Sequence, residues 1–223
     1  MRFLALSLIL FAVPNLTRAD TVFKVGVTTR DFIPAEPYDW RGASTHALRL
    51  IIWYPAAADA REEPQWIGPR IVPFFSAGSD APLGARPRRP LILLSHGDGD
   101  TASSLAWLGT ALAAHGFVAV AVNHPGDNAL EDYTVEGFSL WWLRAVDLSA
   151  VVDAMLAKAI PRAALMLFQH AAISYLFIFV GTCTLAGSMI FRAQCADPEG
   201  SDRDAVHAET ARLAVDFFTA NLH

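Results

Sequence analysis

The chain has 223 residues, of which 53% are hydrophobic and 17% charged, and its formal net charge is −5. This composition excludes a disordered chain, which would be poor in apolar residues and rich in charge. Two cysteines are too few for a small disulfide-stapled scaffold. The negative charge argues against nucleic acid as a partner, because phosphate binding depends on Lys and Arg. We therefore expect one globular domain with a sizeable core. No repeat or motif in the sequence indicates the oligomeric state.

The first 19 residues have the features of a secretory signal peptide. Arg2 provides a positive start, residues 3–13 form an apolar stretch, and 17–19 (TRA) form a small-x-small cleavage site. The apolar stretch is shorter than the ~20 residues that a membrane span needs. We therefore expect export to the periplasm or the medium, with residues 20–223 as a single mature domain.

Two strands are expected near the start of the mature chain. Residues 22–28 alternate between apolar and polar side chains, and residues 47–54 (ALRLIIWY) form a second strand that ends at Pro55. The segment between Pro55 and Pro90 is rich in Pro, Gly, Ala and Arg and has no convincing periodicity. We expect it to cover one edge of the domain.

The centre of the chain has the pattern of a strand, a helix and a second strand. Residues 90–95 (PLILLS) form a continuous apolar run, typical of a strand that is buried on both faces. A helix capped by Ser103 or Ser104 follows, and Gly116 ends it. Residues 117–122 (FVAVAV) form the next buried strand. This order predicts a βαβ unit in a parallel sheet.

Two further helices are expected, over about residues 138–158 and over 204–222. In the first helix Asp147 is assigned to the wetter face, and Pro161 lies beyond its end. The last helix is amphipathic, and we expect four of its apolar residues on the buried side: Val206, Leu213, Phe217 and Phe218.

Polar loops follow both central strands, at the edge where parallel sheets place their functional crevice. The glycines of these loops let backbone N–H groups turn toward a bound oxyanion. A His-Gly-x-Gly pattern after a buried strand is the placement expected of an oxyanion loop; the alternative is a tight turn that leads into the next helix. The candidate oxyanion and crevice residues are His96, Gly97, Asp98, Gly99, Asn123 and His124.

The same loops also admit a metal-site interpretation. Mixed His and carboxylate ligands suit zinc or manganese, and the two strands are expected to be neighbours. The candidate ligands are His96, Asp98, His124 and Asp127. A hydrolase that depends on such a metal is therefore an alternative function.

Residues 90–157 resemble the predicted dienelactone hydrolase branch of the α/β-hydrolases, which is related to platelet-activating-factor acetylhydrolases. The matching stretches are LILLSHGDGD, SLAWLGTALAAHGFVAVAVNHPGDN and EGFSLWWLRAVDLSAVVDAML, and residues 47–55 and 183–222 also resemble this branch. The resemblance implies an α/β fold, a three-layer sandwich around a mainly parallel sheet. It also implies hydrolysis of a small ester or lactone through a serine acyl intermediate without a cofactor, with the Asp98 N–H as the best oxyanion donor.

The nucleophile expected from this resemblance is missing from the sequence. No G-x-S-x-G turn occurs anywhere in the chain, and the best near-match, residues 137–141 (GFSLW), ends in Trp. Ser139 and His170 are the remaining candidates for nucleophile and base, and the family's own base position is occupied by Ser174. Whether the chain is an enzyme therefore stays open, and the alternative is a non-catalytic remnant or binding protein.

A long segment without Asp, Glu, Lys or Arg, Ala163 to Phe191, stands where the catalytic centre is expected. It admits three interpretations: a deletion that shortened the α/β-hydrolase fold, a transmembrane helix over 172–191, or a pair of buried strands over 163–168 and 175–180. We prefer the strand pair, which is compatible with the deletion; membrane association is not favoured.

The two cysteines, Cys183 and Cys195, can pair in only one way. In an exported protein we expect a disulfide between them, and the alternative is two buried free thiols.

Overall fold

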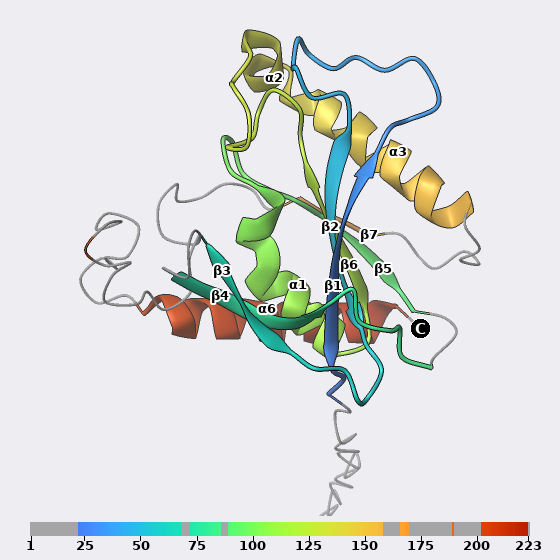
Figure 1. The fold of residues 1–223 in the computed structure, drawn as a ribbon, viewed down its shortest axis with the longest axis vertical. Helices are drawn as coiled ribbons and strands as arrows, with labels where there is room; N and C mark the ends of the chain where they lie inside the picture. Colours follow the sequence, from blue (N-terminus) through green and yellow to red (C-terminus); the bar gives the residue numbers. More distant parts are fainter. Residues whose placement is uncertain are drawn as a thin grey trace, which may run out of the picture.

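The computed structural model describes residues 22–67, 72–85, 89–157, 166–169, 189 and 202–222. The described strands form one open sheet in the order β3-β4-β1-β2-β6-β5-β7, with helices on both sides (Figure 1). Several expectations lie outside the described residues: the signal peptide, His170, Ser174, the second strand at 175–180, the span at 172–191, and the cysteines at 183 and 195.

The two early strands are confirmed. β1 (Val25–Phe32) and β2 (Leu48–Pro55) pair antiparallel along their whole length, from Val25 opposite Pro55 to Phe32 opposite Leu48. β1 lies about three residues further along the chain than expected, because its ladder begins only where β2 supplies a partner. β2 also pairs antiparallel with β6 (Val118–Asn123) and so links the early strands to the central unit.

The segment between Pro55 and Pro90 does cover a sheet edge, but as strands that the sequence pattern did not predict. β3 (Glu63–Ile67) and β4 (Val72–Ser79) pair antiparallel, with a register shift between Gln65 and Trp66, and β4 pairs parallel with β1. Pro64 and Pro73 lie within these strands. Proline within a run argues against a strand in a sequence-based prediction. It is nevertheless tolerated in edge strands and next to irregular pairings, which is why these two strands were not predicted.

The central βαβ unit is confirmed. β5 (Leu91–Ser95) and β6 are parallel neighbours, and a short 3-10 helix, η1 (Ala102–Leu105), leads into the connecting helix α1 (Ala106–Ala114). Gly116 follows α1 with a φ of 99°, the left-handed conformation that favours glycine. Neither Ser103 nor Ser104 caps the helix, because the Ser104 hydroxyl donates instead to Asp100 and to the Thr101 carbonyl.

One strand of the expected strand pair is described. β7 (Met166–Gln169) lies within residues 163–168 and one position beyond, and it pairs parallel with the outer side of β5. The α/β class is confirmed, and the described sheet is mixed, with parallel pairing on both sides of β5.

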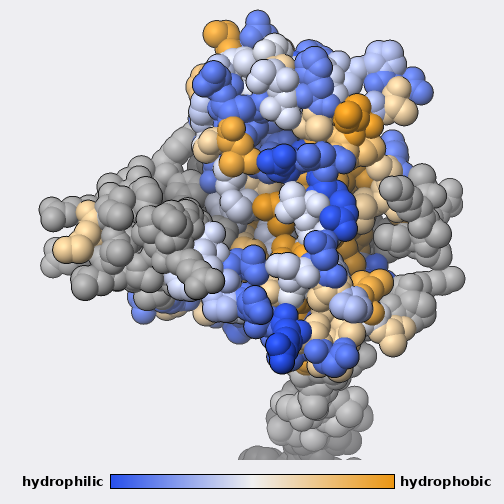
Figure 2. Space-filling model, in the orientation of Figure 1, coloured by the Kyte–Doolittle hydropathy of each residue, from blue (hydrophilic) through white to orange (hydrophobic). Residues whose placement is uncertain are grey.

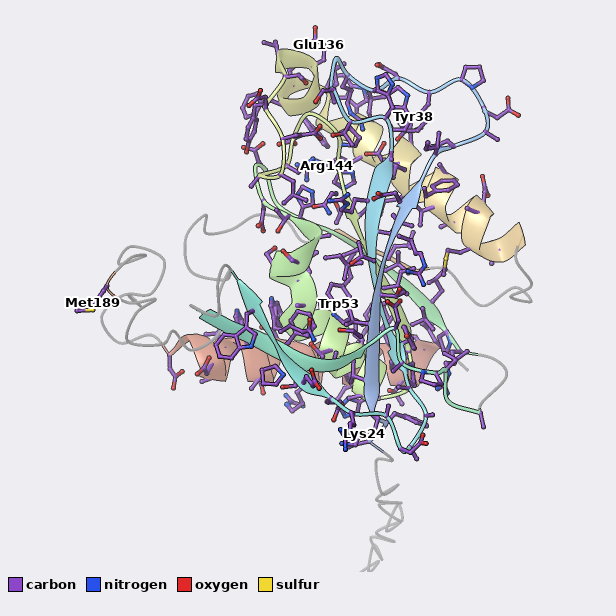
Figure 3. All side chains as sticks on the ribbon, in the orientation of Figure 1. Lys24, Tyr38, Trp53, Glu136, Arg144 and Met189 are labelled. Atoms are coloured by element: carbon purple, nitrogen blue, oxygen red, sulfur yellow. The ribbon has the colours of Figure 1, made fainter. Side chains whose placement is uncertain are left out.

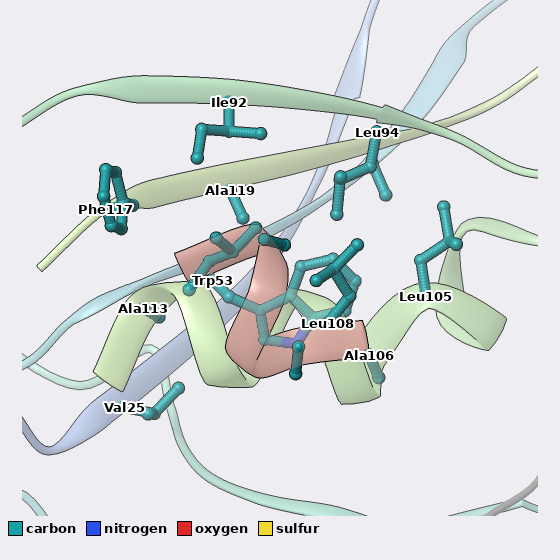
Figure 4. Packing of buried hydrophobic residues seen from close by; sticks show 14 of the residues in the cluster. Val25, Trp53, Ile92, Leu94, Leu105, Ala106, Leu108, Ala113, Phe117 and Ala119 are labelled. Carbon is teal, nitrogen blue, oxygen red and sulfur yellow. The ribbon is translucent and has the colours of Figure 1, made fainter. Parts of the chain in front are cut away.

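The two faces of the sheet carry separate apolar cores, so the molecule has three layers. Ile92 and Leu94 face α1 and α6 (Arg203–Asn221), whereas Leu91 and Leu93 face α3 (Arg144–Ala157). Figure 4 shows the first core, in which Trp53 lies among the side chains of β5 and α1. On the outer face shown in Figure 2, hydrophobic residues are interspersed with hydrophilic ones.

The predicted buried side of the last helix is wrong for three of its four residues. Val206, Leu213 and Phe217 are 49–53% exposed, and only Phe218 is buried. The helix packs against α1 through His207, small alanines and Phe218, and His207 stacks on Trp107 with ring centroids 4.5 Å apart. The small side chains let α6 approach α1 closely, and for this reason the alanine side of α6 is buried and the side with Val206, Leu213 and Phe217 is exposed.

The predicted helix over 138–158 is divided into three pieces: α2 (Val135–Ser139), a 3-10 turn η2 (Trp141–Leu143) and α3. Leu140, with φ −99° and ψ 44°, separates α2 from η2. Within the part of the chain that the structure describes, no helix is both long and apolar enough to cross a membrane.

Candidate functional site

The polar loops after β5 and β6 lie side by side, as expected for the carboxyl ends of parallel neighbours. The rings of His96 and His124 are 5.0 Å apart. The Asn123 side chain accepts a hydrogen bond from the Ala102 N–H at 2.8 Å and so joins the end of β6 to the start of η1. The structure therefore brings the predicted crevice residues together at one end of the sheet, near α2 (Figure 1).

A row of four hydrogen-bonded side chains lies beneath these loops. His124 Nε2 is 2.9 Å from Ser95 Oγ, and His124 Nδ1 is 2.6 Å from Asp147 Oδ2. Arg41 Nη2 donates to both carboxylate oxygens of Asp147 at 3.1 Å. We call Ser95, His124, Asp147 and Arg41 the buried polar row. Its first three members have the atom-to-atom connectivity of a nucleophile, a base and an orienting acid.

Burial dominates the electrostatics of the row, since none of its four side chains is more than 3% exposed. Burial lowers the pKa of His124 well below its ordinary value, and His96, Arg144 and Arg41 act in the same direction. Burial raises the pKa of Asp147 to about 8, whereas the guanidinium on both its oxygens favours the carboxylate. A neutral His124 can accept a proton from Ser95, but the resulting imidazolium is poorly stabilised here.

His96 is held in one tautomer by its two contacts. Its Nδ1 lies 2.6 Å from the Gly97 carbonyl, to which only an N–H can donate, and its Nε2 accepts the backbone N–H of His124 at 3.2 Å. Burial lowers the pKa of His96 to about 4, so the ring is neutral near pH 7. His96 therefore ties the first loop to the second without carrying charge.

The glycine-containing loop after β5, residues 96–100, is held in place by Arg144 and Asp127. Arg144 Nη1 donates to the His96 carbonyl at 2.6 Å, and its Nη2 donates to Gly97 O at 3.4 Å and to Asp127 Oδ2. Asp127 Oδ1 in turn accepts the Gly99 N–H at 3.1 Å. Figure 3 places Arg144 at the end of the sheet near α2. The loop is thus an ordered structure with fixed backbone directions.

The four proposed metal ligands do not form a metal site. The described residues contain no group of three or more His, Cys, Asp or Glu side chains that could hold a metal ion. Both ring nitrogens of His124 and of His96 are used in hydrogen bonds within the protein, and Asp127 is paired with Arg144. Among the described residues the metal-site alternative is therefore contradicted, because the side chains of His96, His124 and Asp127 cross-link the loops by hydrogen bonds and an ion pair.

The near-match around Ser139 is part of a helix and has no elbow geometry. Ser139 is the exposed last residue of α2, and its hydroxyl donates to Val135 O at 2.6 Å. Gly137 is required by close packing and not by an elbow turn, since a Cβ there would lie 2.3 Å from the Gly126 carbonyl oxygen. The glycine allows α2 to rest directly on the second loop.

The sequence interpretation missed most of the buried polar row. Asp147 was assigned to the wetter face of its helix, which is wrong, since it is completely buried. No local sequence pattern marks Arg41 or Ser95 as part of a site. One signal was available for Asp147: it is four positions from Val151, so it shares the helix face that packs on the sheet. A charged residue on an apolar face predicts a buried partner.

Comparisons with known proteins assign no family to the chain. No protein-family model matches the chain, and no curated protein matches it either. A solved structure of a ferulic acid esterase from Streptomyces cinnamoneus is similar, with a TM-score of 0.40 and 24% identity over 48% of this chain and 35% of that one. The chain thus matches about a third of the length of that esterase, and a likeness of this size carries no function with it.

Proposed function

We propose that this protein is an ester or lactone hydrolase of the α/β-hydrolase type, acting through a serine acyl intermediate. The observation that carries the proposal is the Ser95–His124–Asp147 connectivity directly beside the loop 96–99. The resemblance of residues 90–157 to dienelactone hydrolases supports a small ester or lactone as the substrate.

In this proposal Ser95 attacks the carbonyl carbon, and its proton passes to His124 Nε2. Asp147 keeps the Nδ1–H side of the ring oriented, and backbone N–H groups of the loop 96–99 stabilise the oxyanion. The alcohol leaves with the proton from His124. A water molecule then attacks the acyl-serine, gives its proton to His124 and releases the acid, which regenerates Ser95.

A non-catalytic role is the second candidate, and a specific observation favours it. The row is buried, and the Arg41 guanidinium already neutralises Asp147, which then stabilises an imidazolium less well. In this second candidate the row locks the two loops together and the crevice only binds a ligand.

One experiment separates the two candidates. The full chain is incubated with a fluorophosphonate probe, labelled serines are identified by mass spectrometry, and release of p-nitrophenol from p-nitrophenyl acetate is followed. The hydrolase predicts labelling of Ser95 and turnover, both lost in Ser95→Ala and kept in the matched control Ser139→Ala. Absence of labelling and turnover in the unaltered protein would establish the non-catalytic candidate.

We also propose that the protein is exported and that Cys183 and Cys195 form a disulfide. The signal-like residues 1–19 support export, which places the cysteines in an oxidising compartment. Mass spectrometry of protein secreted by an expressing cell tests both statements. Retention of residues 1–19, or two thiols that react with a maleimide in the denatured protein, would contradict them.

A further inference from the structure

Arg144 contacts the backbone of the glycine-containing loop at two consecutive carbonyls. Its Nη1 donates to His96 O at 2.6 Å and its Nη2 to Gly97 O at 3.4 Å. The Gly97 carbonyl also accepts from His96 Nδ1 at 2.6 Å and from the Asp100 N–H at 3.4 Å. Both carbonyls therefore point toward the Arg144 guanidinium, and two further donors help to fix the Gly97 carbonyl.

The direction of the carbonyls determines the direction of the neighbouring N–H groups. The described part of the chain contains no cis peptide bond, and in a trans peptide the N–H points opposite to the C=O. The His96 carbonyl shares its peptide with the N–H of Gly97, and the Gly97 carbonyl shares its peptide with the N–H of Asp98. Both N–H groups consequently point away from the guanidinium, and two adjacent N–H groups with this shared direction can donate to one oxyanion.

Asp127 fixes the guanidinium that holds the loop. It pairs with Arg144 Nη2 and accepts the Gly99 N–H, so the loop is bound at positions 96, 97 and 99 by one ion pair. Only the planar fork of arginine offers several donors at a fixed spacing, whereas a lysine ammonium is a single point charge. The geometry thus requires arginine at position 144, and not simply a positive charge.

We propose that Arg144 is a positioning residue that orients the N–H groups of Gly97 and Asp98 toward the oxyanion formed during ester or lactone hydrolysis. This inference rests on the proposed hydrolase function for its chemistry. Arg144 itself touches no reacting atom; it acts through the two peptide groups.

Kinetics of Arg144 variants give the first test. We expect Arg144→Gln to lower kcat by about 10- to 100-fold and to leave KM within about twofold, because oxyanion donors act in the transition state. Arg144→Lys keeps the charge without the fork, and we expect a loss of about tenfold. The matched control is Arg212→Gln on the exposed side of α6, which should keep full activity. An unchanged kcat in both Arg144 variants would overturn the proposal.

A second measurement does not depend on turnover. Methylphosphonate, a tetrahedral oxyanion, is titrated into the 15N-labelled protein while the amide signals of Gly97 and Asp98 are followed. We expect both signals to shift in the unaltered protein and in Arg212→Gln, and to lose most of this shift in Arg144→Lys, which keeps the charge. Amides that do not move in the unaltered protein, or that move equally in Arg144→Lys, would contradict the proposed positioning.

The outcomes keep the two proposals apart. Shifts that depend on Arg144 without any hydrolysis would refute the hydrolase and leave Arg144 as the organiser of an anion site. Hydrolysis that persists unchanged in the Arg144 variants would retain the hydrolase and refute the positioning role. If Arg144→Gln does not fold, both the kinetics and the NMR titration are carried out on Arg144→Lys alone.

Discussion

The apolar core under α1 and α6 and the buried polar row are equally inaccessible to water, yet they are stabilised in different ways. The core is made of many interchangeable contacts, such as Trp53 with Leu108 and its neighbours (Figure 4). In the row each polar atom depends on one particular partner, for example Asp147 on Arg41. Loss of a partner in the core leaves a cavity, whereas loss of a partner in the row leaves a buried charge.

The largest effect is expected from Asp147→Ala. This change leaves the Arg41 charge buried without its carboxylate and removes the partner of His124 Nδ1, so we expect a loss of about 3–5 kcal/mol in the free energy of unfolding. Urea denaturation measures it. Asp216→Ala, which breaks an exposed pair with Arg212, is the control and should change little. A similar small loss for both variants would mean that the row is not a closed network.

The core should respond somewhat less to a single truncation. Leu108 is buried against the sheet, and we expect Leu108→Ala to cost about 3 kcal/mol in the same assay, through lost burial and a cavity. Leu213→Ala on the exposed side of α6 is the matched control and should cost less than about 0.5 kcal/mol. Equal losses would show that α6 is turned the other way, as the sequence pattern had predicted.

The polar region should also make stability depend on pH. The pKa of His96 is about 4 when folded and close to 6.5 when unfolded, so the unfolded chain binds more protons between these values. The contribution of His96 to the free energy of unfolding is therefore lost as the pH falls through this range, by about 2 kcal/mol between pH 7 and 4.5. Burial raises the pKa of Asp147 to about 8 and that of Asp100 to about 6, which acts in the opposite direction.

A variant isolates the histidine contribution. His96→Gln removes the titrating ring but keeps both carboxyl groups, so the difference in unfolding free energy between it and the unaltered protein should shrink as the pH falls from 7 to 4.5. Urea denaturation across this pH range measures the difference. A constant difference would mean that His96 titrates normally in the folded protein.

The smallest effect is expected at Ser139. Its hydroxyl contacts only its own helix among the described residues, so Ser139→Ala should change the free energy of unfolding by less than about 0.5 kcal/mol. Calorimetric unfolding checks this. A large loss would reveal a partner for Ser139 and would reopen its assignment as a plain surface residue.

Predictability from sequence also differs between the two regions. The strands at 91–95 and 118–123 follow from continuous apolar runs in the sequence. The edge strands β3 and β4 did not, because prolines mask their pattern. The face of α6 was also mispredicted, because large apolar residues stand outward while alanines face α1.

The sequence predicted the loops of the candidate site but not the buried polar row beside them. Loop glycines and histidines after buried strands indicated which two loops lie side by side, because parallel strands bring their carboxyl ends together. Arg41 lies 106 positions before Asp147, and no local pattern connects residues so far apart. The metal interpretation failed for the same reason, since composition shows which ligand types are present but not the direction in which they point.

The sequence by itself determined the α/β class, the βαβ unit and the position of the polar loops, since all three depend on local periodicity and on residues close together in the chain. Only the tertiary structure decided that Ser95, His124, Asp147 and Arg41 join in one buried row, and that Arg144 holds the loop beside it. Hydrogen bonds need atoms within about 3 Å in a defined direction, and such directions are set only when distant segments pack together.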